Sequence, residues 1–425
     1  MKKLFATGVL LAALLAAAIA LPALLRSDDR GGPPRLDGAC RGRGALSAGA
    51  AEVPLRLPGP PTIAGFARLR WGATGQRDPL AARALVVAEP GCAVGLLSLE
   101  ILLVPPALAR AVERRGRELG LDQVIVAATH THAGPGGYWD SFLGGRLATA
   151  PYRPEVLAAL EEAAVRALSG ARAAVAPARL QVGEGDASDL VMNRDGGEVD
   201  GRLVSVRLTR ADGTPVARLV SFGSHPTMLG MRNRLLSGDW PGALMRSRPE
   251  PVLFVEGALG DQSTRGPPGV PGTPEGYAGA VEARLDAVPL SAPDAAPALG
   301  AARATVVLPP TAPGAVPAFL RPAAGWLFQG ALPAEAAVVA LRLGPLTLLA
   351  TPAEPTARVA AGWRAAAGPG AEIVSLAGAY AGYVETRERM ERGEGETDRT
   401  YYGPALAERL GEAVALAARA ARGEP

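Results

Sequence analysis

Two of the chain's three histidines stand one residue apart, in the stretch VIVAATHTHAGPGG at residues 124–137. The β-branched residues before them predict a strand, in which alternate side chains point to the same side. His130 and His132 would therefore face one cleft, and the AGPGG that follows ends the strand and lets backbone come close to a ligand. A His-x-His pair suits zinc, which binds neutral imidazole nitrogens, whereas a hydrogen-bonded pair without metal explains the same pattern.

The third histidine, His225, also ends an apolar segment, directly before Pro226. Taken alone it is explained as a buried or loop histidine, but beside the first pair it is a natural further ligand. Glu354, in TPAEPT, stands between an apolar segment and the expected start of a helix. It would interact with the helix dipole there or, close to the histidines, supply a third protein ligand.

Other polar side chains have both a catalytic and a structural interpretation. Asp261 and Ser263 lie in GALGDQS, where the hydroxyl could act as a nucleophile or position water, or the two side chains could satisfy their own turn. Arg194, in MNRD, would bind a carbonyl or carboxylate oxygen, or be a surface charge. Tyr380 and Tyr383, in AYAGY, are in isolation packed aromatics whose hydroxyls reach water.

The elements that position these residues alternate between apolar stretches and amphipathic patterns, which predicts an α/β fold. Strands are expected at 83–89, 93–104, 123–130, 202–210, 215–225, 251–259, 338–352 and 372–378, and helices at 105–120, 154–171, 275–288, 356–367 and 403–421. The Pro- and Gly-rich residues 264–276 predict a loop, because proline blocks the hydrogen bonds of helices and sheets.

Composition indicates a globular protein and excludes a nucleic-acid-binding surface. The 425 residues are 48% hydrophobic, enough for a buried core, and 44 basic against 41 acidic residues give a net charge of only +3. No basic run with interleaved aromatics, of the kind that nucleic acid requires, occurs in the chain.

The N-terminus predicts export. Two lysines precede an apolar run in residues 1–26, which indicates a signal peptide or a membrane anchor. Residues 27–45 are rich in Gly, Pro and charge and predict a tether, followed by one folded domain over 46–425. An exported protein would be periplasmic or extracellular, soluble or anchored, and Cys40 and Cys92 could pair in that oxidising compartment.

Taken in order, the motifs resemble the neutral, non-lysosomal ceramidase family. The resemblance runs over residues 46–410, through GAAEVPL, IAGFARL, GQRDPLAARALVV, ATHTHAGPGG, MNRD, SFGSHPT, GALGDQS, TPAEPT, AGAYAGYVETRE and YYGP. It implies a four-layer α-β-β-α catalytic domain, without the C-terminal immunoglobulin-like domain that ceramidases carry. It also implies one Zn²⁺ per chain and, as substrate, an N-acylated lipid at a membrane surface, with ceramide first among the candidates.

The resemblance also implies a role for each site residue. The zinc ligands would be His130, His225, Glu354 and Tyr383. The residues of the reaction itself would be His132 as acid and base, Arg194 on the amide oxygen, and Ser263 with Asp261 in the Gly-Asp-x-Ser motif. Zinc would lower the pKa of bound water toward about 7 and polarise the carbonyl for amide hydrolysis.

The chain departs from the family pattern near the expected substrate entrance. Gly395 stands where the family has tyrosine, and Thr264 and Arg265 follow Ser263 in place of Pro-Asn. Two alternatives to ceramide hydrolysis therefore stay open: a related hydrolase of another N-acyl amide or ester, and a weakly catalytic metal- or lipid-binding surface protein.

Overall fold

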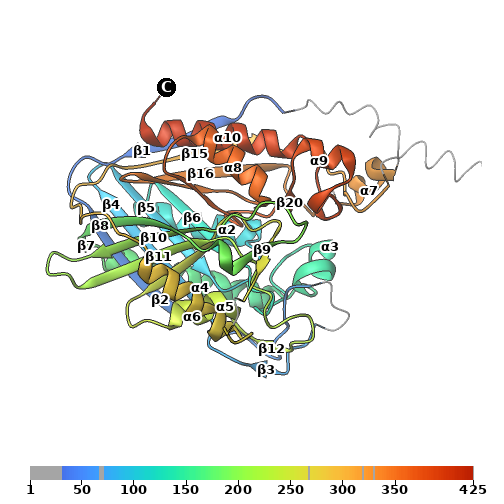
Figure 1. Cartoon of the computed structure of the whole chain (residues 1–425), viewed down its shortest axis with the longest axis horizontal. Helices are drawn as coiled ribbons and strands as arrows, with labels where there is room; N and C mark the ends of the chain where they lie inside the picture. Colours follow the sequence, from blue (N-terminus) through green and yellow to red (C-terminus); the bar gives the residue numbers. More distant parts are fainter. Residues whose placement is uncertain (1–30, 67–70, 267–268, 318–319, 329–330, 425) are drawn as a thin grey trace, which may run out of the picture.

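The structure, a computed structural model, describes residues 31–66, 71–266, 269–317, 320–328 and 331–424. In Figure 1 these residues form successive layers of helix, sheet, sheet and helix. Helices α8 (Ala357–Ala367) and α10 (Leu406–Arg422) cover the upper sheet, while α4 (Pro154–Ala173), α5 (Asp239–Arg246) and α6 (Pro274–Ala287) lie below the second sheet layer. The predicted α/β fold and its layering are confirmed.

Three larger sheets build the two central layers of the described residues. The upper sheet has the order β1 (Arg35–Arg41), β15 (Leu299–Val307), β16 (Glu335–Leu343), β17 (Leu346–Ala350) and β19 (Ala371–Val374). The second layer combines two sheets. One is β6 (Gln123–Ala128), β5 (Cys92–Leu99), β4 (Ala81–Glu89), β2 (Ser47–Pro54) and β7 (Ala176–Pro177); the other is β13 (Val252–Glu256), β11 (Pro215–Phe222), β10 (Arg202–Thr209) and β8 (Arg179–Asp186).

Shorter elements complete the described chain. The helices are α2 (Pro106–Glu118), α3 (Phe142–Gly144), α7 (Arg321–Phe328), α9 (Arg387–Arg392) and the single turns η1 (Gly145–Thr149), η2 (Ser188–Leu190) and η4 (Gly395–Arg399). Paired short strands are β3 (Gly75–Gln76) with β12 (Leu235–Leu236), β9 (Val191–Asn193) with β14 (Gln262–Thr264), and β18 (Glu354–Pro355) with β20 (Tyr383–Val384).

Each large sheet ends in one parallel pair: β5 with β6, β11 with β13, and β17 with β19. The carboxyl ends of these strands meet, as shown by backbone hydrogen bonds from Gly378 to Val126 and from Ser375 to Glu256. Ligands of α/β proteins bind outside the carboxyl ends of such strands. The topology therefore directs the segments after β6, β11, β13 and β17 to one place.

Apolar side chains fill the space between layers. The central core lies between the three sheets and includes Leu85, Ile125, Leu219, Val255 and Leu348. Separate cores join each sheet to its helices: α2 and α4 pack on β4, β5 and β6, α5 and α6 pack on β11 and β13, and α8 and α10 pack on β15 and β16. Because both faces of the sheets are buried, their strands are continuous apolar runs.

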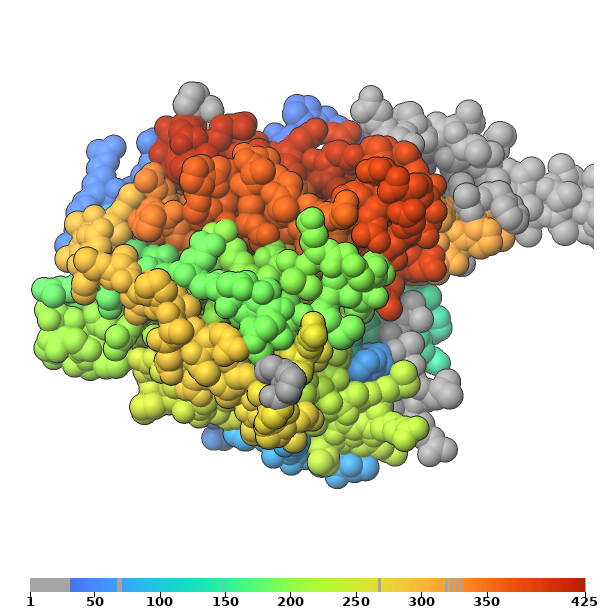
Figure 2. Space-filling view, in the orientation of Figure 1, coloured from blue at the N-terminus to red at the C-terminus, as the bar shows by residue number. Residues whose placement is uncertain are grey.

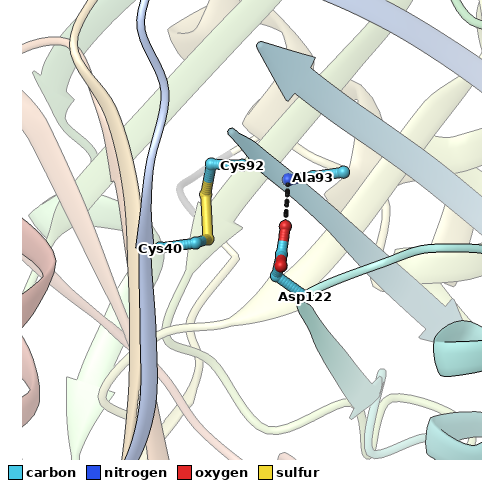
Figure 3. Close-up of a disulfide and its surroundings, with 4 residues drawn as sticks. All are labelled: Cys40, Cys92, Ala93 and Asp122. Carbon is cyan, nitrogen blue, oxygen red and sulfur yellow. Dashed lines mark hydrogen bonds between the residues drawn. A yellow bond between two sulfur atoms is a disulfide. The ribbon is translucent and has the colours of Figure 1, made fainter. Parts of the chain in front are cut away.

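The tether prediction is wrong for part of its range. Residues 35–41 form β1, which pairs along β15, and Cys40 is joined to Cys92 by a disulfide. Figure 3 shows this bridge beside Asp122, whose carboxylate accepts a 2.8 Å hydrogen bond from the amide of Ala93. A disulfide across 52 residues stabilises the fold by about 4 kcal/mol through loop entropy.

The predicted elements are confirmed in outline. Residues 338–352 fall in two strands, β16 and β17, because Gly344 has a φ of +60° and turns the chain between them. Sequence patterns missed β1, β2, β8, β15, α5, α7 and α9. Among the described residues, no helix combines the length and the apolar character needed to span a membrane. The predicted signal peptide or anchor, residues 1–26, lies outside the described residues.

Candidate metal centre

His130 follows β6 and has a strained backbone. Its φ of +59° lies in the left-handed region, which costs a non-glycine residue about 1–3 kcal/mol and is found most often at functional sites. The side chain is buried, and Nδ1 lies 2.7 Å from the carbonyl oxygen of Leu102. Since a carbonyl only accepts, Nδ1 carries the proton and Nε2 presents its lone pair.

His225 follows β11 and is oriented in the same way. Its Nδ1 lies 2.8 Å from the carbonyl oxygen of Gln262, and its Nε2 lies 2.9 Å from the hydroxyl of Tyr383. Burial lowers the pKa of His225 to about 4, so the imidazole is neutral at pH 7. A neutral imidazole with a fixed tautomer is the form that binds a metal ion.

Glu354 and Tyr383 come together because β18 pairs directly with β20. Glu354 is fully buried, and its Oε1 accepts a 2.8 Å hydrogen bond from the hydroxyl of Tyr380. Its Oε2 lies 3.3 Å from Nε2 of His130 and 3.2 Å from Nε2 of His225. Burial opposes ionisation of Glu354, but a proton on either neighbouring imidazole would stabilise the carboxylate, and the net effect lowers the pKa of Glu354 well below the usual range.

These four side chains, His130, His225, Glu354 and Tyr383, form what we call the cradle. Oε2 of Glu354 is buried and has no hydrogen-bond donor among the described residues, although two imidazole nitrogens face it. Both nitrogens are acceptors, so three lone pairs meet in a buried space. A divalent cation relieves that repulsion, and nitrogen and oxygen donors are a set that zinc accepts. The residues present therefore fit a metal ion.

His132 lies beside the cradle, but the predicted strand alternation is wrong: β6 ends at Ala128, and the left-handed turn at His130 brings the two histidines together. Its Nε2 is 3.2 Å from Nε2 of His130, and ligand atoms of all three histidines lie within 4.8 Å of one another. The ring of Phe66 packs on it with centroids 4.7 Å apart. The backbone of His132 is fixed by a hydrogen bond from its amide to the carbonyl of Pro226, just after His225.

Comparisons with known proteins agree with the motif order. Residues 60–246 match the family model for the neutral/alkaline non-lysosomal ceramidase, N-terminal. A neutral ceramidase of Mycobacterium tuberculosis is 32% identical over 150 residues, and one of Oryza sativa is 27% identical over 206 residues. The crystal structure of neutral ceramidase from Pseudomonas aeruginosa superposes with a TM-score of 0.76 at 19% identity, over 90% of this chain and 75% of that one. The predicted resemblance to the neutral ceramidases is confirmed.

The matched regions cover only about a quarter of the length of the curated relatives. The matched region is 32% of this chain but 23% of the Mycobacterium tuberculosis neutral ceramidase, and 43% of this chain but 26% of the Oryza sativa protein. A second solved structure, described as ceramidase complexed with C2, superposes with a TM-score of 0.75 at 18% identity. At such identities the structural match shows the fold.

In this ceramidase-like fold, Arg194 borders the cradle. It donates to Oε1 of Glu396 at 2.9 Å and to the carbonyl oxygen of Gly260, and one of its nitrogens lies 3.4 Å from Nδ1 of His225. Glu396 is buried and also binds Arg399. The guanidinium of Arg194 is therefore held in one orientation at the site, which excludes the interpretation of Arg194 as a surface charge.

Asp261 and Ser263 occupy different positions at the site. Asp261 is buried, accepting hydrogen bonds from the side chain of Asn193 at 2.7 Å and from the amide of Ala357 at 2.9 Å. It therefore connects the segment of Arg194 to the start of α8. Ser263 is half-buried and its backbone bridges to that of His225, so it lies next to the cradle.

Sequence reasoning named Tyr380 without a role at the site and did not single out Glu396 or Arg399. Tyr380 was interpreted as a packed aromatic, yet its hydroxyl holds Glu354. Glu396 follows Gly395, which has a φ of +62° and where a side chain would have to displace the carboxylate of Glu385. The one signal was the departure at Gly395 itself, since it marked the segment where this chain differs from the ceramidase pattern.

Proposed function

We propose that the chain is a zinc-dependent hydrolase that cleaves the amide bond of an N-acylated lipid, releasing a fatty acid and an amine. Ceramide, which would give a sphingoid base, is the first candidate substrate. The observation that carries the proposal is the convergence of His130, His225, Glu354 and Tyr383 on one buried point. The resemblance to neutral ceramidases supports the substrate class.

The cradle would hold one Zn²⁺ through Nε2 of His130 and His225, the carboxylate of Glu354 and the phenol oxygen of Tyr383. When bound, zinc supplies a Lewis acid and an activated water near neutral pH. Arg194 points a fixed positive charge at the site, where it would stabilise the negative charge that develops on the amide oxygen. Its pairing with Glu396 orients the guanidinium before substrate arrives.

Proton transfer falls to His132. The leaving amine departs poorly without a proton, and His132 is a half-buried imidazole 3.2 Å from a cradle nitrogen. Ser263, whose backbone bridges to that of His225, would orient the substrate. Asp261 holds the two segments in register and is assigned a positioning role in place of a catalytic one.

A small apolar pocket of about 20 Å³ borders the cradle, so an acyl chain on this side would require its aromatic walls to move apart. Trp139, Phe328, Leu332, Tyr380 and Tyr401 line it, and Tyr380 is the residue that also binds Glu354. Aromatic walls beside a polar centre are typical of sites for amphiphilic ligands. The apolar N-terminal sequence and the Cys40–Cys92 disulfide support an exported enzyme that meets its substrate at a membrane surface.

The test is release of fatty acid from a panel of ceramides and other N-acyl compounds by the full chain, measured by mass spectrometry. We expect release that stops on chelation and returns with Zn²⁺. Release from other N-acyl compounds alone would retain the mechanism and reject ceramide. Stoichiometric zinc binding without any release would reject the hydrolase and favour a metal- or lipid-binding surface protein.

A further inference from the structure

The single turn η4 places a second arginine at the cradle. The Cζ atom of Arg399 lies 5.9 Å from the ring centroid of Tyr383, and that of Arg194 lies 5.7 Å from the same centroid. Glu396 contacts both arginines: its Oε1 accepts a hydrogen bond from Arg194, and its Oε2 accepts one from Arg399. We call Arg194, Gly395, Glu396 and Arg399 the rim.

The rim carries surplus positive charge. One carboxylate, that of Glu396, is shared by two guanidinium groups in the described contacts. Neighbouring acids have other partners: Asp195 and Glu385 pair with Arg389, and Glu394 pairs with Arg392. Asp398, adjacent in sequence, is exposed to solvent. A group that approaches the cradle from the rim therefore meets two guanidiniums that share one carboxylate in direct contact, while Asp398 has no described ion pair with either arginine.

Arg399 is available to a ligand in a way that Arg194 is not. The side chain of Arg399 is 54% exposed, against 22% for Arg194, whose nitrogens are engaged by Glu396 and the carbonyl of Gly260. Arginine presents five N–H donors in a planar fork, so one contact with Glu396 leaves donors for a second anion. Figure 2 shows red C-terminal segments lying against green segments at the surface, and the ion pair of Arg194 with Glu396 joins the residue after β9 to η4.

We propose that Arg399 binds an anionic group on the substrate, a carboxylate or phosphate a few bonds from the scissile amide. The preferred substrates would then be N-acyl amino acids or phosphorylated N-acyl amines over neutral ceramide. Arginine recognises both anions by paired hydrogen bonds. This inference rests on the proposed function, since it names the substrate class of the same site.

A purely structural role for Arg399 gives a different expectation. If the arginine only held Glu396 in place, its loss would disturb Arg194 and weaken turnover of every amide alike. If it binds the anion, its loss affects charged substrates and leaves matched neutral ones unchanged, chiefly through KM.

The experiment compares four N-lauroyl substrates with the full-length, zinc-loaded chain. N-lauroylglycine carries a carboxylate, N-lauroylglycinamide is its neutral match, N-lauroyl-O-phosphoethanolamine carries a phosphate, and N-lauroylethanolamine is its neutral match. Each is tested with wild type, Arg399→Gln and Arg392→Gln. Arg392 is the matched control, because it is 52% exposed and pairs with Glu388 and Glu394, which are outside the cradle.

We expect wild type to prefer at least one anion over its neutral match by about tenfold in kcat/KM, the size of one charge-assisted hydrogen bond. Arg399→Gln should abolish that preference through KM, and Arg392→Gln should keep it. The carboxylate and phosphate arms identify which anion is bound. Equal turnover of charged and neutral substrates by wild type would overturn the inference while leaving the hydrolase intact.

Binding separates failure of the inference from failure of the proposed function. If no substrate is hydrolysed, calorimetry with N-lauroylglycine and N-lauroylglycinamide still tests the rim. Tighter binding of the anion that Arg399→Gln removes would support the anion site without the hydrolase. Equal binding of the two compounds, or equal losses in both arginine variants, would overturn it.

Discussion

The cradle and the rim are adjacent, but different interactions hold them. In the cradle, the imidazoles of His130 and His225 are fixed by backbone carbonyls at the ends of buried strands. In the rim, Glu396 is fixed by two guanidiniums, and Arg399 reaches solvent. Backbone groups in a core cannot move without disrupting packing, whereas the Arg399–Glu396 ion pair is open to solvent on the arginine side, contributes little to stability and rearranges more readily.

This difference separates the chemistry from the choice of substrate. A metal site tolerates little displacement of its ligands, so it belongs on elements that the core determines. A selective contact needs access to solvent and can change by single substitutions at the surface. The cradle follows the motif order of ceramidases, whereas Gly395 in the rim departs from it. Substitutions in the cradle should therefore impair the chemistry, whereas substitutions in the rim should change the choice of substrate.

The largest effect is expected from Glu354→Gln. The amide removes the negative charge that faces both imidazoles, so zinc content should fall from one per chain to near zero at micromolar metal. Turnover should fall at least about a hundredfold, since even residues that only orient metal ligands affect affinity or activity by ten- to a hundredfold. Mass spectrometry of bound metal and the acyl-release assay measure the two effects.

Glu256→Gln is the matched control. Glu256 is also fully buried, but burial raises its pKa well above the usual range, so the substitution replaces a carboxyl whose ionisation is disfavoured. This variant should retain its zinc. A Glu354→Gln protein that still bound one zinc per chain would break the assignment of the cradle.

The pH dependence of the metal-free chain tests the electrostatics of the cradle. The pKa of His225 is about 4 when folded and 6.5 for an ordinary histidine, so the unfolded chain takes up the proton first as pH falls. The contribution of His225 to stability is full above about pH 6.5 and is lost as pH falls toward 4. The loss is about 3 kcal/mol, at about 1.4 kcal/mol per pKa unit.

Two measurements check this expectation. NMR titration of the imidazole signals in metal-free protein should give a midpoint near pH 4 for His225. Denaturant unfolding at pH 7 and 4.5 should show a smaller pH effect for His225→Asn than for wild type. A midpoint near 6.5 would contradict the burial and neutral state described for this histidine.

Asp261→Asn tests the connection between cradle and rim. Both oxygens of Asp261 accept hydrogen bonds from donors, so an amide must turn its NH₂ toward either Asn193 or the amide of Ala357. The NH₂ group and the donor it faces would then be buried without an acceptor between them. This should lower the free energy of unfolding by about 2–3 kcal/mol, measured by urea unfolding. The control is Asp212→Asn, an exposed turn residue that accepts from Thr214, with an expected effect below about 0.5 kcal/mol.

Sequence patterns predicted the strands and the cradle for the same reason. Buried strands are apolar runs, and His130, His225 and Glu354 each follow one closely, so the residues and their elements were visible together. The pattern failed for β1, RLDGACR, because this edge strand exposes charged side chains and contains Gly38. Exposed edges lack the apolar run that identifies a strand.

What the sequence could not provide is long-range pairing. Tyr380 and Tyr383 stand three residues apart with similar neighbours; the family resemblance selected Tyr383, but only the pairing of β18 with β20 shows that Tyr380 binds Oε1 of Glu354 and Tyr383 contacts His225. The same applies to Arg399, one of many arginines in the chain, which the fold brings to Tyr383. Contacts between residues this far apart depend on the whole topology.

The smallest effect is expected from Gly395→Ala, and it sharpens the comparison at the rim. Gly395 has a φ of +62°, and an added Cβ would lie 2.2 Å from Oε2 of the buried Glu385. The left-handed backbone alone costs alanine about 1 kcal/mol, so with the displacement of Glu385 we expect about 2 kcal/mol by urea unfolding. Gly393→Ala isolates the backbone effect, because Gly393 has a φ of +68° with open space around it.

The two glycine variants should also differ in selectivity. Gly395 directly precedes Glu396, so a shift of the backbone at Gly395 displaces the carboxylate that holds Arg399. Gly393 lies further from Glu396 along the chain. We expect Gly395→Ala to lose any preference for anionic N-lauroyl substrates while retaining zinc, and Gly393→Ala to keep both. If Gly395→Ala lost its zinc as well, the cradle would depend on the rim, and the separation of chemistry from selection would be wrong.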